Sequence, residues 1–180
     1  MISHPDRCIF LHQRKCAGTA IKEAFGLRTE DSDWHTYNDG VLDPAFAERP
    51  AGYLVFSIVR NPWDRFVSGW KYCKSTRDRS LRQVLLDPPR EGHDYRHLTR
   101  PQHQILLDQD GKPVYDVLLH YETLQDDFDQ LCERLGRRTQ QLAERNRGSH
   151  APYRDYFDDE TRRLLAERYA RDIELFGYRW

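Results

Sequence analysis

The sequence predicts an α/β fold, with a central parallel β-sheet flanked by helices in one domain over residues 1–180. Two short apolar runs carry this prediction, Cys8–Leu11 and Tyr53–Val59, because each is bounded by polar residues and followed by a helical pattern. The second run is apolar at almost every position, which is typical of a central strand buried on both faces of a parallel sheet. A chain of 180 residues is also long enough to build one domain around a substantial core.

The first half of the chain predicts one helix after each of these strands. Gly18–Phe25 places Ile21 and Phe25 on the same helix face. The second helix begins at Pro62, because proline suits the first turn of a helix. Its apolar face carries Trp63, Phe66, Val67 and Trp70 at helical spacing. Residues 27–50 are polar without periodicity, so we assign them no element.

The second half predicts one further strand and at least two helices. Residues 76–100 are rich in charge and proline, and we expect a surface loop there with a short helix near Leu81–Leu86. Val114–Leu119 is the third predicted strand, and the helix that follows it stops at Gly136. The last predicted helix is Asp158–Ile173, with either Asp158 or Asp159 as its N-cap. Its core face carries Leu165, Tyr169 and Ile173.

Composition and charge restrict the class of protein. The formal net charge is −1, so binding of nucleic acid through bulk positive charge is not expected. No apolar run approaches the ~20 residues that span a membrane, and the first residues, MISHPDRC, lack a signal-peptide pattern. We therefore expect a cytoplasmic protein without a membrane partner. The eight histidines show no metal-ligand spacing, so the sequence predicts no metal site, and the cysteines are expected to be reduced thiols: Cys8, Cys16, Cys73 and Cys132.

A loop with the residues of an anion-binding site follows the first strand, in LHQRKCAGTA at residues 11–20. Lys15 supplies a mobile positive charge, Gly18 permits close approach of the backbone, and Thr19 offers a hydroxyl and an amide at a helix start. The lysine precedes the glycine and no glycine lies upstream, so the order of a nucleoside-triphosphatase loop is absent. The pattern predicts a site for a phosphate-like group, with an ordinary strand-to-helix turn as the alternative.

A second candidate anion site follows the central strand, in SIVRNPWDRFVSGW at residues 57–70. Arg60 stands at the carboxyl end of the strand, where open parallel sheets bind ligands, and Ser68 lies in the following helix. A guanidinium and a hydroxyl together suit a phosphate. The alternative is structural: Arg60 forms an ion pair at the edge of the sheet, and Ser68 is only solvated.

The two segments together resemble the sulfotransferase family that uses 3′-phosphoadenosine-5′-phosphosulfate (PAPS), in the branch of carbohydrate sulfotransferases and their bacterial relatives. The family's 5′-phosphosulfate loop follows the pattern h-I-P-K-T-G-G-T-S, and Phe10–Ala20 is similar to it. Its 3′-phosphate motif, V-R-N-P-x-D-R-h-x-S, is matched at every fixed position by Val59–Ser68. His120–Gly136 resembles the family's R-Y-E-D-L stretch, and Tyr153–Tyr178 resembles its C-terminal helix with the F-G-Y ending.

The first loop also departs from the family's pattern. Arg14 replaces the proline and adds charge, Ala17 replaces the first glycine, and Ala20 replaces the final serine. The positions that are kept are Lys15, Gly18 and Thr19. The resemblance implies a P-loop-like nucleotide-binding fold. It also implies an enzyme that transfers a sulfuryl group from PAPS to a hydroxyl of a carbohydrate or a small molecule, with adenosine-3′,5′-bisphosphate (PAP) as the product.

The resemblance further implies roles for the matched residues. Lys15 would act in catalysis near the bridging oxygen and stabilise the departing 5′-phosphate. Arg60 and Ser68 would bind the 3′-phosphate, which distinguishes PAPS from ATP. A late basic loop wraps the nucleotide in the family. The residues expected to hold the donor are Arg14, Lys15, Cys16, Ala17, Gly18, Thr19, Ala20, Arg60, Ser68, Arg147, Gly148 and Ser149.

A general base must take the proton of the acceptor hydroxyl, and a histidine or a carboxylate does so near neutral pH. His35 is the first candidate, because some relatives that act on sulfated polysaccharides carry catalytic histidines between the first loop and the second strand. His103, Glu23 and Glu122 stay open as alternatives. Two other functions also stay open: a non-catalytic protein that binds PAPS or PAP, and a P-loop kinase-like enzyme.

Overall fold

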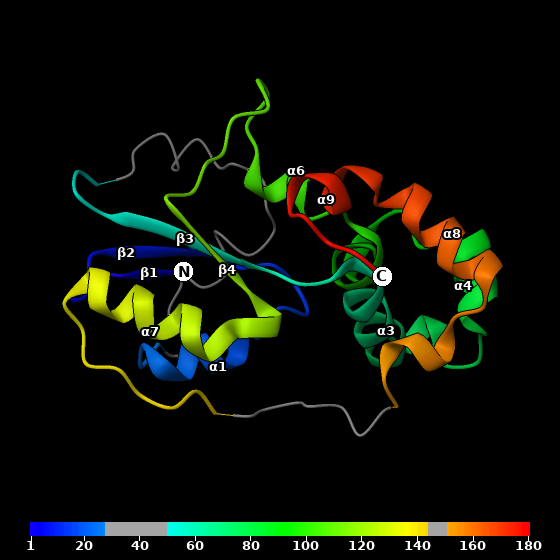
Figure 1. Cartoon of the computed structure of the whole chain (residues 1–180), viewed down its shortest axis with the longest axis horizontal. Coiled ribbons are helices and arrows are strands. Elements are labelled where there is room, and N and C mark those ends of the chain that lie inside the picture. The colour runs from blue at the N-terminus through cyan, green and yellow to red at the C-terminus, as the bar shows by residue number, and fades with distance from the viewer. Residues whose placement is uncertain (28–49, 144–150) are drawn as a thin grey trace. The chain divides into compact units, whose positions relative to one another are not determined.

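Four strands form one sheet, in the order β1-β2-β3-β4, within the residues that the computed structural model describes, 1–27, 50–143 and 151–180 (Figure 1). Three of the strands run parallel to one another: β2 (Cys8–Leu11), β3 (Leu54–Val59) and β4 (Val117–His120). This arrangement confirms the predicted parallel sheet. The two-residue β1 (Ile2–Ser3) pairs with β2 in the antiparallel sense. It is too short to leave a pattern in the sequence.

The parallel strands bring their carboxyl ends to one edge of the sheet. Leu11, the last residue of β2, pairs with Ser57, and Val59, the last residue of β3, pairs with His120. The Ser57 hydroxyl donates a buried hydrogen bond of 2.6 Å to the carbonyl of Leu11. This bond fixes the point at which the loop after β2 leaves the sheet, at the edge where open parallel sheets bind ligands.

The chain forms two compact units. The first unit comprises Met1–Val59 and Gln104–Arg145, and the second comprises Arg60–His103 and Asn146–Trp180. The sheet belongs to the first unit, whereas the described part of the second unit is helical. The assignment of residues 1–180 to one domain stays a prediction.

Two helices cover one face of the sheet in the first unit, α1 (Gly18–Ala24) and α7 (Leu124–Leu135) (Figure 1). The core between these helices and the sheet includes Phe10, Ile21, Phe56, Phe128 and Leu131. The helix α7 ends at Gly136, which has φ 65° and forms the left-handed C-cap that the sequence predicts. The short elements nearby are α6 (His103–Leu106) and η4 (Tyr121–Thr123).

The second unit is built around α3 (Pro62–Tyr72), which begins at the predicted proline. The Asn61 side chain caps this helix by accepting a hydrogen bond of 3.0 Å from the backbone N–H of Trp63. The other elements are η2 (Lys74–Thr76), α4 (Leu81–Leu86), α5 (Gly92–Asp94), η3 (Tyr95–Thr99), η5 (Tyr153–Tyr156), α8 (Asp159–Arg168) and α9 (Ala170–Leu175). Within the described ranges, no helix combines the length and the apolar character needed to cross a membrane.

Two predictions for the second unit need correction. Residues 76–100 contain the expected helix α4, but they are not only a surface loop, because Leu98 is fully buried in the core. The predicted helix Asp158–Ile173 is two helices, α8 and α9, with Asp158 as the N-cap of the first. The break falls at Tyr169, whose buried hydroxyl donates to the carbonyls of Leu98 and Thr99 at 3.2 and 3.1 Å.

Candidate functional site

The loop between β2 and α1 contains two residues in the left-handed backbone conformation. Lys15 has φ 67° and Ala17 has φ 54°. Left-handed residues that alternate with right-handed ones turn successive N–H groups toward one point, as in anion-binding nests. Glycine adopts this conformation without steric cost. The loop therefore has a glycine-like backbone at Ala17, the position where the resembled motif has glycine.

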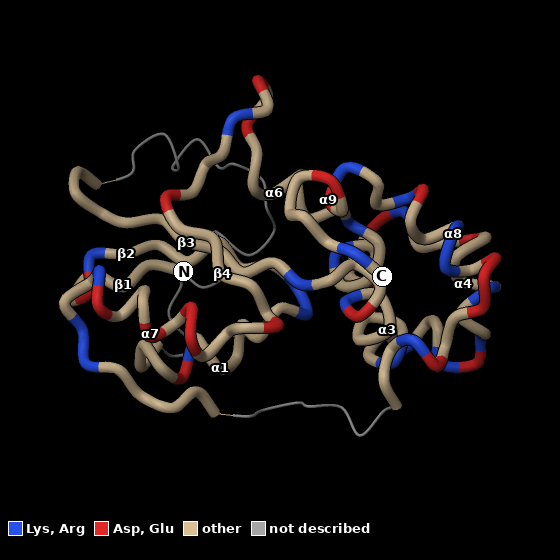
Figure 2. The backbone as a smooth tube through the Cα atoms, viewed as in Figure 1, with Lys and Arg blue, Asp and Glu red and all other residues tan. Residues whose placement is uncertain are grey.

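The side chains of this loop divide into an outer and an inner set. Thr19 is exposed and Arg14 and Lys15 are half-buried, so these three side chains can meet a ligand. Cys16 and Ala20 are buried in the core of the first unit, so only their backbone amides remain for binding. Lys and Arg positions are distributed along both units and interspersed with Asp and Glu (Figure 2). The positive charge of the loop is therefore a local feature.

Gly18 lies directly against the ring of His12. A Cβ atom built at Gly18 would lie 1.9 Å from Nε2 of His12, far inside van der Waals contact. The His12 side chain is buried, and its ring centroid lies 5.6 Å from that of Phe10. The glycine is thus required for packing, whether or not its backbone also approaches a ligand.

Arg60 directly follows β3 and is almost fully buried, with 6% of its surface exposed. Its Nε–H donates to Oδ2 of Asp64, one turn along α3, at 2.8 Å. The structural alternative for Arg60 therefore holds in part, because the residue does form an ion pair. A guanidinium carries five N–H donors, and it binds a phosphate through such donors in pairs.

A glutamine and an aspartate hold the backbone of Arg60 in place. The side-chain amide of Gln102 accepts a hydrogen bond from the N–H of Arg60 and donates one to its carbonyl, both at 2.9 Å. Asp172, which is fully buried in α9, accepts from the backbone N–H groups of Gln102 at 2.7 Å and His103 at 2.9 Å. Gln102 therefore holds both backbone groups of Arg60, and Asp172 holds the backbone of Gln102 in turn.

The other motif residues lie on α3. Ser68 is half-buried, so its hydroxyl is accessible at least in part. Arg65 is buried and donates to the carbonyl of Arg100 at 2.7 Å, which gives this motif arginine a structural role. Arg60 and Ser68 thus belong to the same unit, and the motif places them before and within the same helix.

Of the four candidates for the general base, the structure describes three. His35 lies outside the described residues, as do the late-loop candidates Arg147, Gly148 and Ser149. Glu23 on α1 and Glu122 in η4 are exposed. His103 has a carboxylate partner, because its Nδ1 lies 2.6 Å from Oδ1 of Asp172. A carboxylate only accepts, so Nδ1 carries the proton and Nε2 is the basic nitrogen.

Three residues of this region were not singled out from the sequence. Gln102 and Asp172 support Arg60 and His103, but they lie 70 residues apart, so no local pattern joins them. His120 ends β4 beside Val59, and its backbone N–H donates to Oδ2 of Asp127 at 2.7 Å. It directly follows the strand predicted over Val114–Leu119, whereas the observed strand is Val117–His120 and ends on it.

The fold defines an α/β protein in which a loop with left-handed residues follows a strand of a parallel sheet, and comparison with known proteins agrees with this class. The sequence model of the Sulfotransferase family matches residues 1–179. The chain belongs to the sulfotransferase family, and its activity class is the transfer of a sulfuryl group to an acceptor. An uncharacterized protein of Archaeoglobus fulgidus is 31% identical over 85 residues, which are 47% of this chain and 69% of that protein. No solved structure matches the chain.

Proposed function

We propose that the protein transfers the sulfuryl group of PAPS to a hydroxyl of a carbohydrate or a small molecule. The observation that carries the proposal is the loop after β2. Its half-buried Lys15 and its Ala17 have left-handed backbones, and Thr19 exposes its hydroxyl at the start of α1. A lysine charge, turned amides and a hydroxyl suit a phosphosulfate group.

The donor has two anionic ends, and we assign residues to each. Lys15, Thr19, the Arg14 side chain and the amides of Cys16–Ala20 hold the 5′-phosphosulfate. Arg60 and Ser68 hold the 3′-phosphate, and the double hydrogen bond of Gln102 keeps the backbone of Arg60 in one place. The residues assigned to the rest of the nucleotide are Arg147, Gly148 and Ser149.

In the reaction, the acceptor oxygen forms a bond to sulfur while the bond from sulfur to the bridging oxygen breaks. The pair of electrons stays on the 5′-phosphate, and PAP leaves. Lys15 stabilises the charge that develops on the bridging oxygen, which is the main demand on the protein in such a transfer. A base takes the proton from the acceptor. His35 is the first candidate for this base, and His103 is the second, because Asp172 fixes its Nδ1 and leaves Nε2 to accept a proton.

Calorimetric titration tests the binding of the donor. PAP is compared with AMP and ADP in one buffer. One charge-assisted hydrogen bond to the 3′-phosphate contributes about 1.5–3 kcal/mol, so PAP is expected to bind about 10- to 100-fold more tightly than AMP. Equal binding of AMP, or tighter binding of ATP with Mg²⁺, would contradict the proposal; the latter result would favour a kinase-like enzyme.

Transfer of labelled sulfuryl groups from PAPS to a panel of hydroxyl acceptors tests the chemistry. Lys15→Ala is expected to lower turnover by about 10²–10³-fold, as the loss of one charge-stabilising donor does elsewhere. Lys112→Ala, at an exposed turn, is the matched control and is expected to leave turnover unchanged. Tight PAP binding without transfer to any acceptor would identify a non-catalytic binding protein. Unchanged turnover in Lys15→Ala would remove the assigned role of Lys15.

The two candidate bases are separated by pH profiles. The base sets the acidic limb of kcat/KM, since transfer needs its unprotonated form. We expect His35→Asn to remove this limb and His103→Asn to keep it. The reverse result would assign the proton transfer to the His103–Asp172 pair.

A further inference from the structure

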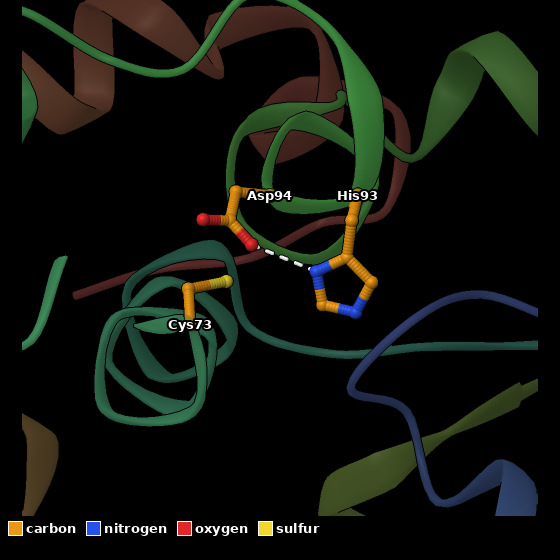
Figure 3. Close-up of side chains that lie close together, drawn as sticks. All are labelled: Cys73, His93 and Asp94. Atoms are coloured by element: carbon orange, nitrogen blue, oxygen red, sulfur yellow. Dashed lines mark hydrogen bonds and ion pairs between the residues drawn. The ribbon is translucent and has the colours of Figure 1, made fainter. Parts of the chain in front are cut away.

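Three donor atoms of different chemical kinds come together in the second unit, on residues outside the two motifs. Cys73 directly follows α3, whereas His93 and Asp94 belong to α5. A ring nitrogen of His93, the sulfur of Cys73 and a carboxylate oxygen of Asp94 all lie within 4.8 Å of one another (Figure 3). The sequence predicts no metal site, because Cys73 and His93 are 20 residues apart and share no ligand spacing.

Hydrogen bonds to the Asp94 carboxylate hold the three side chains together. Nδ1 of His93 donates to Oδ1 of Asp94 at 2.7 Å, and the Ser75 hydroxyl donates to Oδ2. The Cys73 thiol donates to the same carboxylate. Donors from two segments of the second unit therefore meet at one carboxylate.

The backbone of Cys73 is fixed where α3 ends. Its N–H donates to the carbonyl of Gly69 at 2.9 Å, and its own carbonyl accepts from the Thr76 hydroxyl at 3.0 Å. The Cys73 residue itself is 2% exposed. The thiol is thus held in position before any ligand binds.

The ring of His93 is fixed by stacking. Its centroid lies 3.9 Å from that of His97 and 5.9 Å from that of Tyr72. Nδ1 of His97 lies 2.9 Å from the carbonyl of His93, so His97 donates to this carbonyl and its own ring is oriented by the bond. Only the edge of the site is open, because the His93 side chain is 55% exposed and that of Asp94 is 20% exposed.

We propose that Cys73, His93 and Asp94 form a binding site for a divalent transition-metal ion of the zinc class. One sulfur, one imidazole nitrogen and one carboxylate oxygen make a donor set that suits zinc rather than magnesium or calcium. Three protein ligands and one water complete a tetrahedron, and the Ser75 hydroxyl orients the carboxylate from outside the ligand set. The ion takes the place of the two protons that now bridge the donors. Binding releases the thiol proton to solvent and moves the ring proton of His93 from Nδ1 to Nε2, so that Nδ1 can ligate the metal.

The tetrahedral geometry lies within reach of the present side chains. Ligand distances of about 2.0–2.3 Å put the donor atoms of a tetrahedral site roughly 3.3–3.8 Å apart. The donors already lie within 4.8 Å of one another, so at most about 1.5 Å separates this arrangement from the tetrahedral one. A nucleophilic role for Cys73 is disfavoured, because an adjacent carboxylate opposes the thiolate, whereas a bound cation favours it.

Titration with Co²⁺ under anaerobic conditions tests the site without any assay of activity. A cobalt–thiolate bond gives an intense charge-transfer band in the near ultraviolet, which oxygen and nitrogen ligands do not give. We expect this band in the wild-type protein at one equivalent of Co²⁺, and we expect Zn²⁺ to abolish it by displacement. The band is expected to vanish in Cys73→Ser.

Matched variants distinguish binding of Co²⁺ at this site from unspecific binding of Co²⁺ to other thiols. Cys132→Ser changes another thiol, whose pKa burial raises, and it is expected to keep the band. Asp94→Asn keeps the size of the side chain but replaces one acceptor oxygen with an NH2 group that only donates. It is the second variant, measured in case Cys73→Ser does not fold, and it is expected to weaken Co²⁺ binding at least about tenfold because one charged ligand is lost. A band that persists in Cys73→Ser, or no band in the wild type with excess Co²⁺, would overturn the proposal.

Discussion

Replacing Gly18 with alanine is expected to destabilise the first unit, because the new methyl group would meet the ring of His12. The added Cβ would lie 1.9, 2.3 and 2.7 Å from Nε2, Cδ2 and Cε1 of that ring. The ring is buried beside Phe10, so it cannot simply swing into solvent. Overpacking of this kind costs about 1–3 kcal/mol, and the higher helix propensity of alanine returns at most about 1 kcal/mol. The net loss is about 1–2 kcal/mol.

Thermal and urea unfolding measure this loss, which corresponds to a decrease in Tm of about 2–8 °C for a chain of this length. Thr19→Ala, at the next and exposed position, is the control and is expected to change stability by less than about 0.5 kcal/mol. The double variant His12→Ala, Gly18→Ala completes a cycle. Removal of the ring makes room for the methyl group, so a coupling energy of about 1–2 kcal/mol is expected. Additive effects, or a Gly18→Ala protein as stable as wild type, would refute the packing of His12 against Gly18.

Three further predictions follow from other contacts. Ala17→Gly is expected to stabilise the protein by a few tenths to about 1 kcal/mol, because it removes left-handed strain that exceeds the entropy cost of glycine; a lower urea midpoint would contradict this. Asp172→Asn is expected to cost about 1.5–3 kcal/mol, since the buried carboxylate accepts from Gln102 and His103, and unchanged unfolding would show that the network is not stabilising. Burial raises the pKa of Tyr169 from 10.0 to about 12. The neutral phenol therefore stabilises the fold fully below pH 10.0, and this contribution is lost as the pH rises through about 12. Unfolding midpoints across this range should fall less steeply in Tyr169→Phe than in wild type, and parallel curves would argue against the shift.

The elements with strong local patterns were predictable from the sequence. Cys8–Leu11 is a strand with the bounds that its apolar run predicts, and α3 begins at Pro62 because proline at the first turn is a local signal. The break at Tyr169 was not predictable in this way. Helical periodicity continues through it in the sequence, whereas the hydroxyl of Tyr169 is held by carbonyls some 70 residues earlier.

The candidate site shows the same division. Lys15 and Thr19 are indicated by their place after a strand, and the structure leaves Thr19 exposed and Lys15 half-buried; their roles stay predictions. The sequence suggested a backbone reason for Gly18, but the structure adds a packing reason, the ring of His12. The pairing of Arg60 with Gln102 could not be predicted, because a buried glutamine 42 residues away leaves no periodic trace.

The side chain of Gln102 pairs with the backbone of Arg60 as a neighbouring strand would. A primary amide presents one donor and one acceptor, as a peptide group does, and here it pairs with both backbone groups of Arg60 at 2.9 Å. The first residue after β3 thus has both backbone groups paired through a side chain. Glutamate has the same shape but only accepts, so at this position it would oppose a carboxylate to the carbonyl of Arg60. The amide nitrogen of Gln102, which glutamate lacks, therefore supplies the hydrogen bond to the carbonyl of Arg60 where the chain leaves the sheet.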